Sequence, residues 1–396
     1  MADSFDQIFL RAKEWLLSPL ANHAPGWLVQ VVSSLINIVA LLGVFLTLFA
    51  FISVLERKIL GRMQNRYGPN RVGPFGLFQP VADGIKMLIK EDIVPARADK
   101  VVHFLAPVIL AAVAILTLGV IPYGRNMTAF RIDGGILFFF AVGSATELAV
   151  FMAGWASNNK FSMLGAMRAI AQMFSYELPL IIAVLPVVMV VGSLMPDRIV
   201  FSQGEYTLNI LPRWFVFTPW GAAAFILFFV SGLVESNRTP FDVPEGESEI
   251  VAGHMTEYSG FKYATFFMAE YLGMFAVSGL AVTLFLGGWN SPAHVLEFVP
   301  SYVWFFAKLS ALLFVYIWLR ATLPRMRVDQ MMNVAWKFML PMSFGCLIAA
   351  AVWHYAGRGM HGWLWSLFVI VVVYSALSIL LDTRRKFARR VYRFAE

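Results

Sequence analysis

The residues best suited to chemistry lie in one acidic stretch, from Glu235 to Gly260, which has long apolar runs on both sides. The stretch contains one fixed positive charge, Arg238, and several carboxyl side chains. The carboxyl groups belong to Glu235, Asp242, Glu245, Glu247, Glu249 and Glu257. A carboxyl group near a low-dielectric region and near like charges has a raised pKa, and a raised pKa suits proton transfer near neutral pH.

A solvated acidic loop is the simpler interpretation of this stretch. Its two prolines, Pro240 and Pro244, and its apolar side chains instead favour an ordered loop that packs against the rest of the protein. Those apolar side chains are Phe241, Val243, Ile250 and Val251.

Further charged residues lie inside apolar runs, where each costs several kcal/mol at the centre of a bilayer. They are Glu147, Glu177, Glu270 and Lys308. For any one of them, a buried salt bridge or hydrogen bond that fixes helix packing is the plain alternative. Three such carboxyl groups beside an acidic stretch favour a proton or cation relay, in which Glu147, Glu177 and Glu270 continue the path into the membrane.

The composition places these residues in a membrane protein. The chain is 59% hydrophobic and 14% charged, with a mean hydropathy of +0.70, whereas soluble domains are about one quarter charged. The single cysteine, Cys346, excludes an internal disulfide and an iron–sulfur cluster, which needs about four ligands. The six histidines are scattered, with no pair spaced for haem or zinc. We therefore expect no metal site and no redox cofactor bound by this chain.

Apolar runs long enough to cross a bilayer, about 20 residues each, recur along the chain and predict nine membrane spans. Their ranges are 27–55, 101–123, 134–156, 174–195, 214–235, 264–287, 300–320, 337–356 and 362–382. Most Lys and Arg residues lie on the side that holds the acidic stretch, which the positive-inside rule assigns to the cytoplasm. The predicted fold is an all-α polytopic bundle, and the net charge of +7 is a signal of topology rather than of nucleic-acid binding.

This topology divides the chain into three parts. Residues 1–26 form an extracytoplasmic segment, residues 27–356 form an eight-helix bundle, and residues 357–396 add a further helix and a basic cytoplasmic tail. The expected cytoplasmic loops are 56–100, 157–173, 236–263 and 321–336.

Two of the connections have local features that predict structure. Within 56–100, apolar residues at helical spacing predict an amphipathic helix over 75–91 that lies at the membrane interface. The segment 157–173 turns near Ser157 and re-enters the membrane as a helix, and prolines at 179 and 186 predict breaks in the span that follows.

The residues considered so far are compatible with three functions. The chain is a redox-linked subunit that receives a lipophilic carrier, a stand-alone proton- or sodium-coupled transporter, or a structural anchor for soluble partners. A transporter favours an inverted repeat with matching broken helices, and no convincing repeat is present. An anchor needs no charged residues in the bilayer.

Three regions, 56–100, 154–179 and 235–271, resemble the quinone-site membrane subunit of respiratory complex I, the NADH-quinone oxidoreductase. The matching motifs are Glu56-Arg57-Lys58, Gly61-Arg62-Met63-Gln64, Gly68-Pro69-Asn70, Ala82-Asp83, Lys86, Asn237-Arg238, Pro240-Phe241-Asp242, Glu257-Tyr258 and Glu270-Tyr271. Two features depart from the family pattern. Span 362–382 is a ninth span where eight are common, and Val328 replaces a common aromatic residue.

The resemblance implies a quinone tunnel and a proton path. The tunnel and its headgroup chamber would be lined by Arg57, Arg62, Asp83, Lys86, Glu235, Arg238 and Phe241. The proton path would contain Glu147, Glu177, Asp242, Glu245, Glu247, Glu249, Glu257 and Glu270.

The resemblance also implies that quinone is the substrate, either ubiquinone or menaquinone, and that the chain is not catalytic alone. FMN and iron–sulfur clusters would belong to partner subunits of the complex in a bacterial plasma membrane. The other partners would be adjacent small membrane subunits and lipid. Related hydrogenase-type complexes use similar subunits and remain an alternative.

Overall fold

The computed structural model describes residues 6–21, 25–207, 211–243, 246, 250–357 and 359–384. The predicted path residues Glu245, Glu247 and Glu249, together with Pro244 and the tail beyond residue 384, lie outside these ranges. The α-helices are α2 (Ile8–Ala21), α3 (Gly26–Met63), α4 (Gln79–Ile89), α5 (Lys100–Gly119), α6 (Gly135–Gly143), α7 (Ala145–Ala156), α8 (Lys160–Val191), α9 (Pro196–Ser202), α10 (Pro219–Glu235), α12 (Gly260–Phe285), α13 (Ser301–Thr322), α14 (Val328–Val334), α15 (Leu340–Tyr355) and α16 (Met360–Arg384).

Shorter elements complete the chain. Five residues of π-helix, Ala335–Met339, join α14 to α15, and 3₁₀ turns occupy Pro74–Gly76, Phe215–Phe217, Gly253–Met255 and His294–Leu296. Strands β1 (Tyr206–Thr207) and β2 (Leu211–Pro212) form a small antiparallel pair. The pair lies in a connection between helices, so the predicted all-α class is confirmed.

Eight helical segments of the described chain are long and apolar enough to cross a membrane. Two of them are composite, since α6 and α7 together form Gly135–Ala156, and α14 continues through the π-helix into α15. Helix α10 is also apolar but has only 17 residues. It begins at Pro219 instead of the predicted 214, because residues Phe215–Phe217 form a 3₁₀ turn and Thr218 caps the helix by accepting from the Gly221 N–H at 3.2 Å.

Helix α8 differs from the prediction that prolines interrupt the span after residue 157. The chain turns there as expected, and Asn159 then caps α8 by accepting a hydrogen bond from the Phe161 N–H at 3.0 Å. From Lys160 the helix is continuous through Pro179 and Pro186, so the predicted breaks are wrong. Both prolines are buried where α8 packs against α7, α10 and α15, and tertiary packing in a membrane protein stabilises helices that contain proline.

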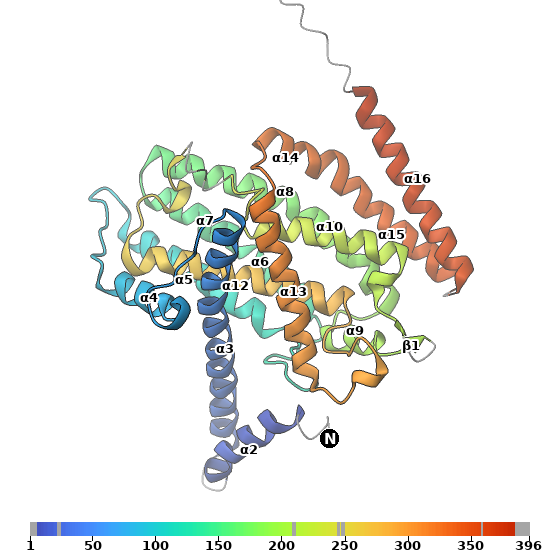
Figure 1. The fold of residues 1–396 in the computed structure, drawn as a ribbon, viewed down its shortest axis with the longest axis horizontal. Coiled ribbons are helices and arrows are strands. Elements are labelled where there is room, and N and C mark those ends of the chain that lie inside the picture. The colour runs from blue at the N-terminus through green and yellow to red at the C-terminus, as the bar shows by residue number, and fades with distance from the viewer. Residues whose placement is uncertain are drawn as a thin grey trace, which may run out of the picture.

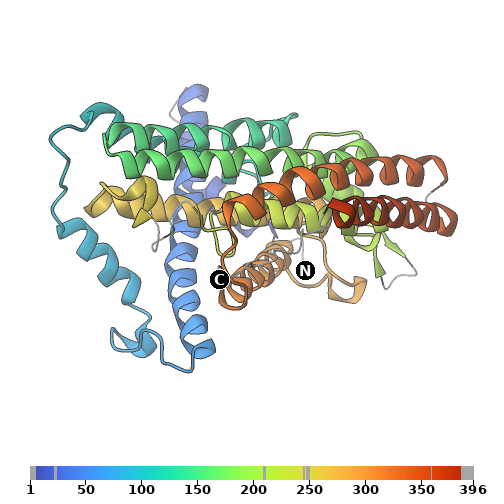
Figure 2. The same cartoon turned by 90° about the horizontal axis from the view of Figure 1, so that it is seen from above.

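The bundle is built around α12, in which every residue from Met274 to Phe285 is buried. A helix that is apolar on all sides is suited to such a central position. Helices α15 and α16 run side by side at one edge of the molecule, and α3 crosses α8 and α12 at a steep angle in both views (Figures 1 and 2). Helix α3 has 38 residues, or roughly 57 Å at 1.5 Å per residue, so it extends well past the predicted end at residue 55.

The connection between α3 and α5 reaches out to one side of the bundle and contains α4 (Figure 2). The helix predicted over 75–91 is present but begins at Gln79, because Pro74–Gly76 form a 3₁₀ turn in which Phe75 has a φ of +53°. No residue of α4 is buried in the chain itself. Its interfacial position stays a prediction.

Candidate functional site: a carboxyl-lined cavity beside a buried arginine cluster

Two of the predicted relay residues, Glu147 on α7 and Glu177 on α8, lie in direct contact. Their side chains form a hydrogen bond with each other. A hydrogen bond between two carboxyl groups requires a proton on one of them, so this arrangement is suited to holding one proton between two helices. Glu235, the last residue of α10, lies close enough to interact electrostatically with both.

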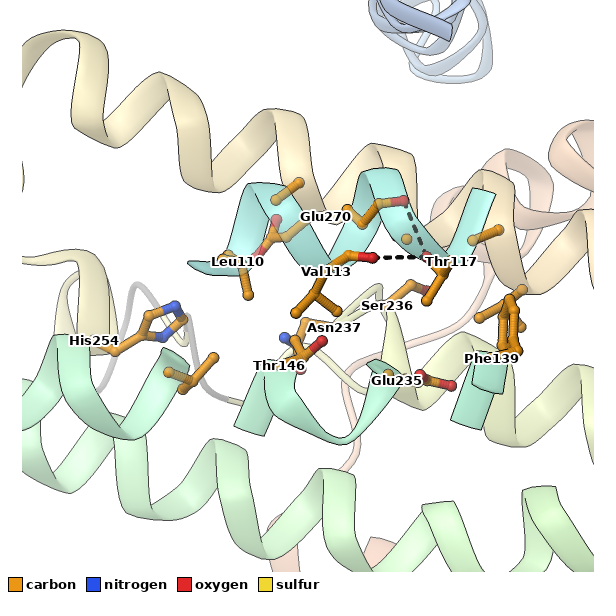
Figure 3. A pocket seen from close by; sticks show the side chains of 17 residues that line it. Leu110, Val113, Thr117, Phe139, Thr146, Glu235, Ser236, Asn237, His254 and Glu270 are labelled. Atoms are coloured by element: carbon orange, nitrogen blue, oxygen red, sulfur yellow. Dashed lines mark hydrogen bonds between the residues drawn. The ribbon is translucent and has the colours of Figure 1, made fainter. Parts of the chain in front are cut away.

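Glu235 and Glu270 line one cavity of about 60 Å³ between α5, α6, α7 and α12. Figure 3 shows Glu235 near Phe139 at one end of this cavity and His254 at the other. The Oε2 atom of Glu235 and the Nδ1 atom of His254 are buried without a hydrogen-bond partner among the described residues. A cavity of this size accommodates a few water molecules, each occupying about 10–15 Å³ of such volume. Water would satisfy both atoms.

Thr117 also lines the cavity, but its hydroxyl is already engaged. It donates to the backbone carbonyls of Val113 and Ala114 at 3.1 and 3.0 Å, as the dashed lines in Figure 3 show. The other polar side chains that line the cavity come from Thr146, the acidic stretch and Glu270.

A second cluster surrounds Glu56, which is 4% exposed near the end of α3. Its carboxylate accepts hydrogen bonds from Arg238 at 3.2 Å, from Tyr271 at 2.6 Å and from Arg320. The Arg238 guanidinium also lies over the Tyr271 ring, 4.0 Å from its centroid. Burial alone would lower the pKa of Arg238, but Tyr271, Glu56 and Glu270 outweigh it and raise that pKa. The arginine therefore stays charged inside the protein.

The acidic stretch is ordered by Gln172, a fully buried residue of α8. Its side-chain amide donates to the carbonyls of Val234 and Phe241, at 3.1 and 2.8 Å. Phe241, Val243 and Ile250 are buried as predicted. Val251 is 70% exposed, contrary to prediction, because its φ of +63° turns the chain outward.

Two predicted path residues lie apart from the cavity. Asp242 pairs with Arg325 at 3.0 Å. Burial raises the pKa of Asp242, although Arg325, Arg320 and Arg238 act in the opposite direction. Glu257 accepts a hydrogen bond from Asn159 at 2.6 Å. Neither carboxyl group lines the cavity.

The predicted tunnel residues of the loop 56–100 lie apart from the cavity and are more exposed. Asp83 on α4 pairs with Arg57 at 2.7 Å and with Lys86 at 3.5 Å. Partial burial would raise the pKa of Asp83, but the hydrogen bond and charge of Arg57 dominate and lower it. Arg62 lies over the Tyr67 ring at 4.8 Å. This group is connected to the Glu56 cluster through α3, which carries Glu56 and Arg57 side by side.

Sequence reasoning did not assign a role to Glu56, Tyr271, Arg320 or His254. Glu56 and Tyr271 belong to the motifs that carry the family resemblance. Glu56 also directly follows an apolar run, from which its burial could have been predicted. Arg320 and His254 had none, since each becomes part of a site only through contacts with distant segments.

Lys308, the remaining charge inside a span, has a structural role. Its ammonium donates to the carbonyls of Leu286, Gly288 and Asn290 at 2.7, 2.9 and 2.7 Å, which caps the end of α12. It also lies 4.0 Å from the centroid of the Trp214 ring. The packing interpretation holds for this residue.

Comparison with known proteins agrees with the resemblance. The family model described as NADH dehydrogenase matches residues 36–351 and ends before α16. A protein of Ralstonia pickettii (strain 12J), named as the H subunit of NADH-quinone oxidoreductase, is 45% identical over 336 residues, covering 83% of this chain and 94% of the relative.

Two further relatives have the same name. One from Geobacillus sp. (strain WCH70) is 45% identical over 83% of this chain and 96% of its own length. One from Bacillus cytotoxicus is 48% identical over 75% of this chain and 86% of its own length. This chain is a multi-pass membrane protein with several helices that can span a membrane. Like these relatives, it is one subunit of a larger oxidoreductase and not an enzyme by itself. The chain therefore belongs to the NADH dehydrogenase family.

Proposed function

We propose that this chain forms much of the quinone access tunnel of a proton-pumping NADH-quinone oxidoreductase and links quinone reduction to a carboxyl proton path. Reduction of a quinone to a quinol takes two electrons and two protons. The electrons would come from FMN and iron–sulfur clusters in partner subunits. Either ubiquinone or menaquinone is compatible with this role.

One observation carries the proposal: a single short segment, 235–238, belongs to both clusters. Glu235 lines the carboxyl cavity, and Arg238 reaches Glu56 three residues later. A change of charge on a quinone headgroup near Arg238 would therefore act on Glu235 over a short distance through a low-dielectric region, where Coulomb interactions are strong. Such a change is local electrostatics that biases a proton path.

The proton would then move among the carboxyl groups in membrane-spanning helices. Glu235 interacts with the hydrogen-bonded pair Glu147 and Glu177, and the shared cavity connects Glu235 to Glu270. In this proposal Asp242 and Glu257 border the path from the side, because each already has a protein partner. The remaining acidic residues of the stretch, Glu245, Glu247 and Glu249, would complete the connection.

The tunnel entrance would use the first connection. Arg57, Arg62, Asp83 and Lys86 lie near the end of α3 and on α4, and the Glu56 cluster lies at the inner end of the same region. Phe241, buried beside Tyr176 at 5.9 Å between ring centroids, would border the chamber. We place this end of the bundle in the cytoplasm of a bacterial cell, below the redox subunits, by the positive-inside rule.

The proposal is tested with Glu235→Gln and Arg238→Ala in membranes that contain the whole complex. We expect NADH:quinone activity to fall by tenfold or more, while NADH oxidation by an artificial acceptor continues. The redox subunits are untouched, and in Arg238→Ala the Glu56 carboxylate keeps Arg320 and Tyr271 as partners, so the complex should still assemble. Arg198→Gln, on the exposed side of α9, is the matched control and should retain both activities. Wild-type quinone activity in both variants would contradict the proposal, and loss of both activities would indicate failed assembly.

The family match favours this role over a stand-alone transporter. The purified chain in liposomes separates the two, since a transporter would exchange protons or sodium without partners. We expect no such exchange.

A further inference from the structure

A groove of about 550 Å³ lies outside the sites described above, where α5 begins and where α7 turns into α8. Its lining includes Arg97, Asp99, Trp155, Asn158, Lys160 and Met163. This volume is within the range of small-molecule binding pockets, about 300–1,000 Å³.

The position of the groove along the spans indicates its depth in a bilayer. Three membrane spans begin or end beside it: Lys100–Gly119, Gly135–Ala156 and Lys160–Val191. The residues that join these spans must therefore lie near the boundary between the hydrocarbon core and water.

The walls of the groove are fixed by hydrogen bonds between its two sides. The Asp99 N–H donates to the Ala156 carbonyl at 3.1 Å, and the Asn158 side-chain amide donates to the Arg97 carbonyl at 3.2 Å. The groove is therefore preformed, which lowers the ordering cost of binding a ligand.

The charge of the groove favours an anion. Within the described residues, Arg97 and Lys160 form no ion pair and are both exposed. The one carboxylate of the groove, Asp99, already accepts from the Val101 and Val102 N–H groups as the cap of α5. Two cations thus face the groove while its only carboxylate is engaged. The start of α8 adds the positive end of a helix dipole.

The apolar part of the groove is suited to a lipid. Trp155 is 64% exposed, and tryptophan is enriched at membrane interfaces, where its ring contacts both chains and headgroups. Met163, one turn into α8, continues this apolar wall toward the bilayer.

We propose that this groove binds the phosphate headgroup of an anionic phospholipid, with Arg97 and Lys160 contacting the phosphate and Trp155 and Met163 contacting the upper acyl chains. Basic pockets at the cytoplasmic ends of membrane helices bind such headgroups. The position at the membrane boundary favours a lipid over free phosphate, which shares the same anionic group.

The test uses the whole complex, purified and delipidated, and native mass spectrometry to count bound phosphatidylglycerol during a titration. Arg97→Gln combined with Lys160→Gln should weaken retention of at least one lipid by roughly tenfold to thirtyfold, because two cation contacts are lost. Lys90→Gln combined with Lys100→Gln removes the same charge from exposed cations at this end of the bundle, outside the groove, and should leave that lipid bound. Phosphatidylcholine should bind the wild-type site at least tenfold more weakly than phosphatidylglycerol.

Three results would overturn the proposal. One is equal retention of phosphatidylglycerol in the wild type and the groove variant. Another is displacement of the lipid by inorganic phosphate at millimolar concentration, which would identify a site for the free anion. The third is loss of a partner subunit from the groove variant without loss of lipid, which would show that a protein covers the groove.

Discussion

Glu56 and Glu235 are two inward-facing glutamates of the same bundle, but their surroundings are opposite: Glu56 has cationic partners, and Glu235 has none among the described residues. Glu56 accepts hydrogen bonds from two arginines and a tyrosine. Glu235 has a buried oxygen without a partner, and no cation of the described residues forms an ion pair with it. The first arrangement holds a carboxylate in one state, whereas the second leaves a carboxyl group free to exchange a proton.

In the proposed function, this difference separates charges that fix the structure from carboxyl groups that transfer protons. A buried carboxylate surrounded by cations contributes to a fixed geometry, because removing one partner leaves another charge uncompensated. A carboxyl group next to other carboxyl groups, such as Glu235 near Glu147 and Glu177, changes its protonation when a nearby charge changes. Lys308, which is satisfied by three carbonyls, belongs to the first class.

The largest expected effect comes from breaking the compensated cluster. Glu56→Gln would leave Arg238 and Arg320 without their shared carboxylate, and breaking a buried ion pair costs about 3–5 kcal/mol. We expect most of the complex to fail to assemble, measured as the amount of this chain in purified complex. Glu235→Gln serves as the control and should assemble at wild-type levels. Normal assembly of Glu56→Gln would remove the distinction between the two clusters.

The next effect concerns the hydrogen-bonded carboxyl pair. Glu147→Gln and Glu177→Gln should each reduce quinone-linked proton transport by roughly a hundredfold, the low end of the usual contribution of one acid–base group. The double variant should be hardly worse than either single one, because the pair holds one shared proton and acts as a unit. Additive losses in proteoliposome pumping assays would mean that the two groups work independently.

A smaller effect, on stability, is expected from His254. Burial lowers the pKa of His254 to about 4 from an ordinary value of 6.5. The folded protein therefore holds the neutral imidazole, and its contribution is fully present above about pH 6.5 and is lost as the pH falls toward about 4. We expect up to about 2 kcal/mol of stability to be lost between about pH 7 and about pH 5.

Thermal unfolding of the complex at several pH values measures this loss. His254→Gln keeps a polar side chain at the same place but cannot titrate, so it should flatten the pH dependence. Because all other titratable groups are the same in both proteins, the difference between the two curves isolates the imidazole. Parallel curves would show that His254 does not carry the effect.

The smallest effect is expected at the exposed group on α4. Asp83→Asn removes the ion pairs with Arg57 and Lys86, and exposed pairs contribute about 1 kcal/mol or less. We expect unchanged assembly but a KM for quinone raised several-fold, if Asp83 shapes the tunnel entrance. An unchanged KM would remove Asp83 from the tunnel.

Much of the fold could be predicted from the sequence, because membrane spans are recognised by length and composition alone. The positions of the spans were correct to within a few residues in most cases. The errors arose where local signals compete with packing. The prolines of α8 were expected to break the helix, and the end of α3 was placed before Glu56 because charged residues begin there.

The family and the residue types of the site followed from the sequence by itself, since the acidic stretch and the carboxyl groups in the spans are visible as exceptions to an apolar background. Only the tertiary structure decided which charges are compensated. Glu56 meets Arg320 across 264 residues, whereas Glu235 meets other acids. Spacing along a chain predicts neighbours on one helix, but the partners of a buried charge come from helices that pack together, and their register is set by the whole bundle.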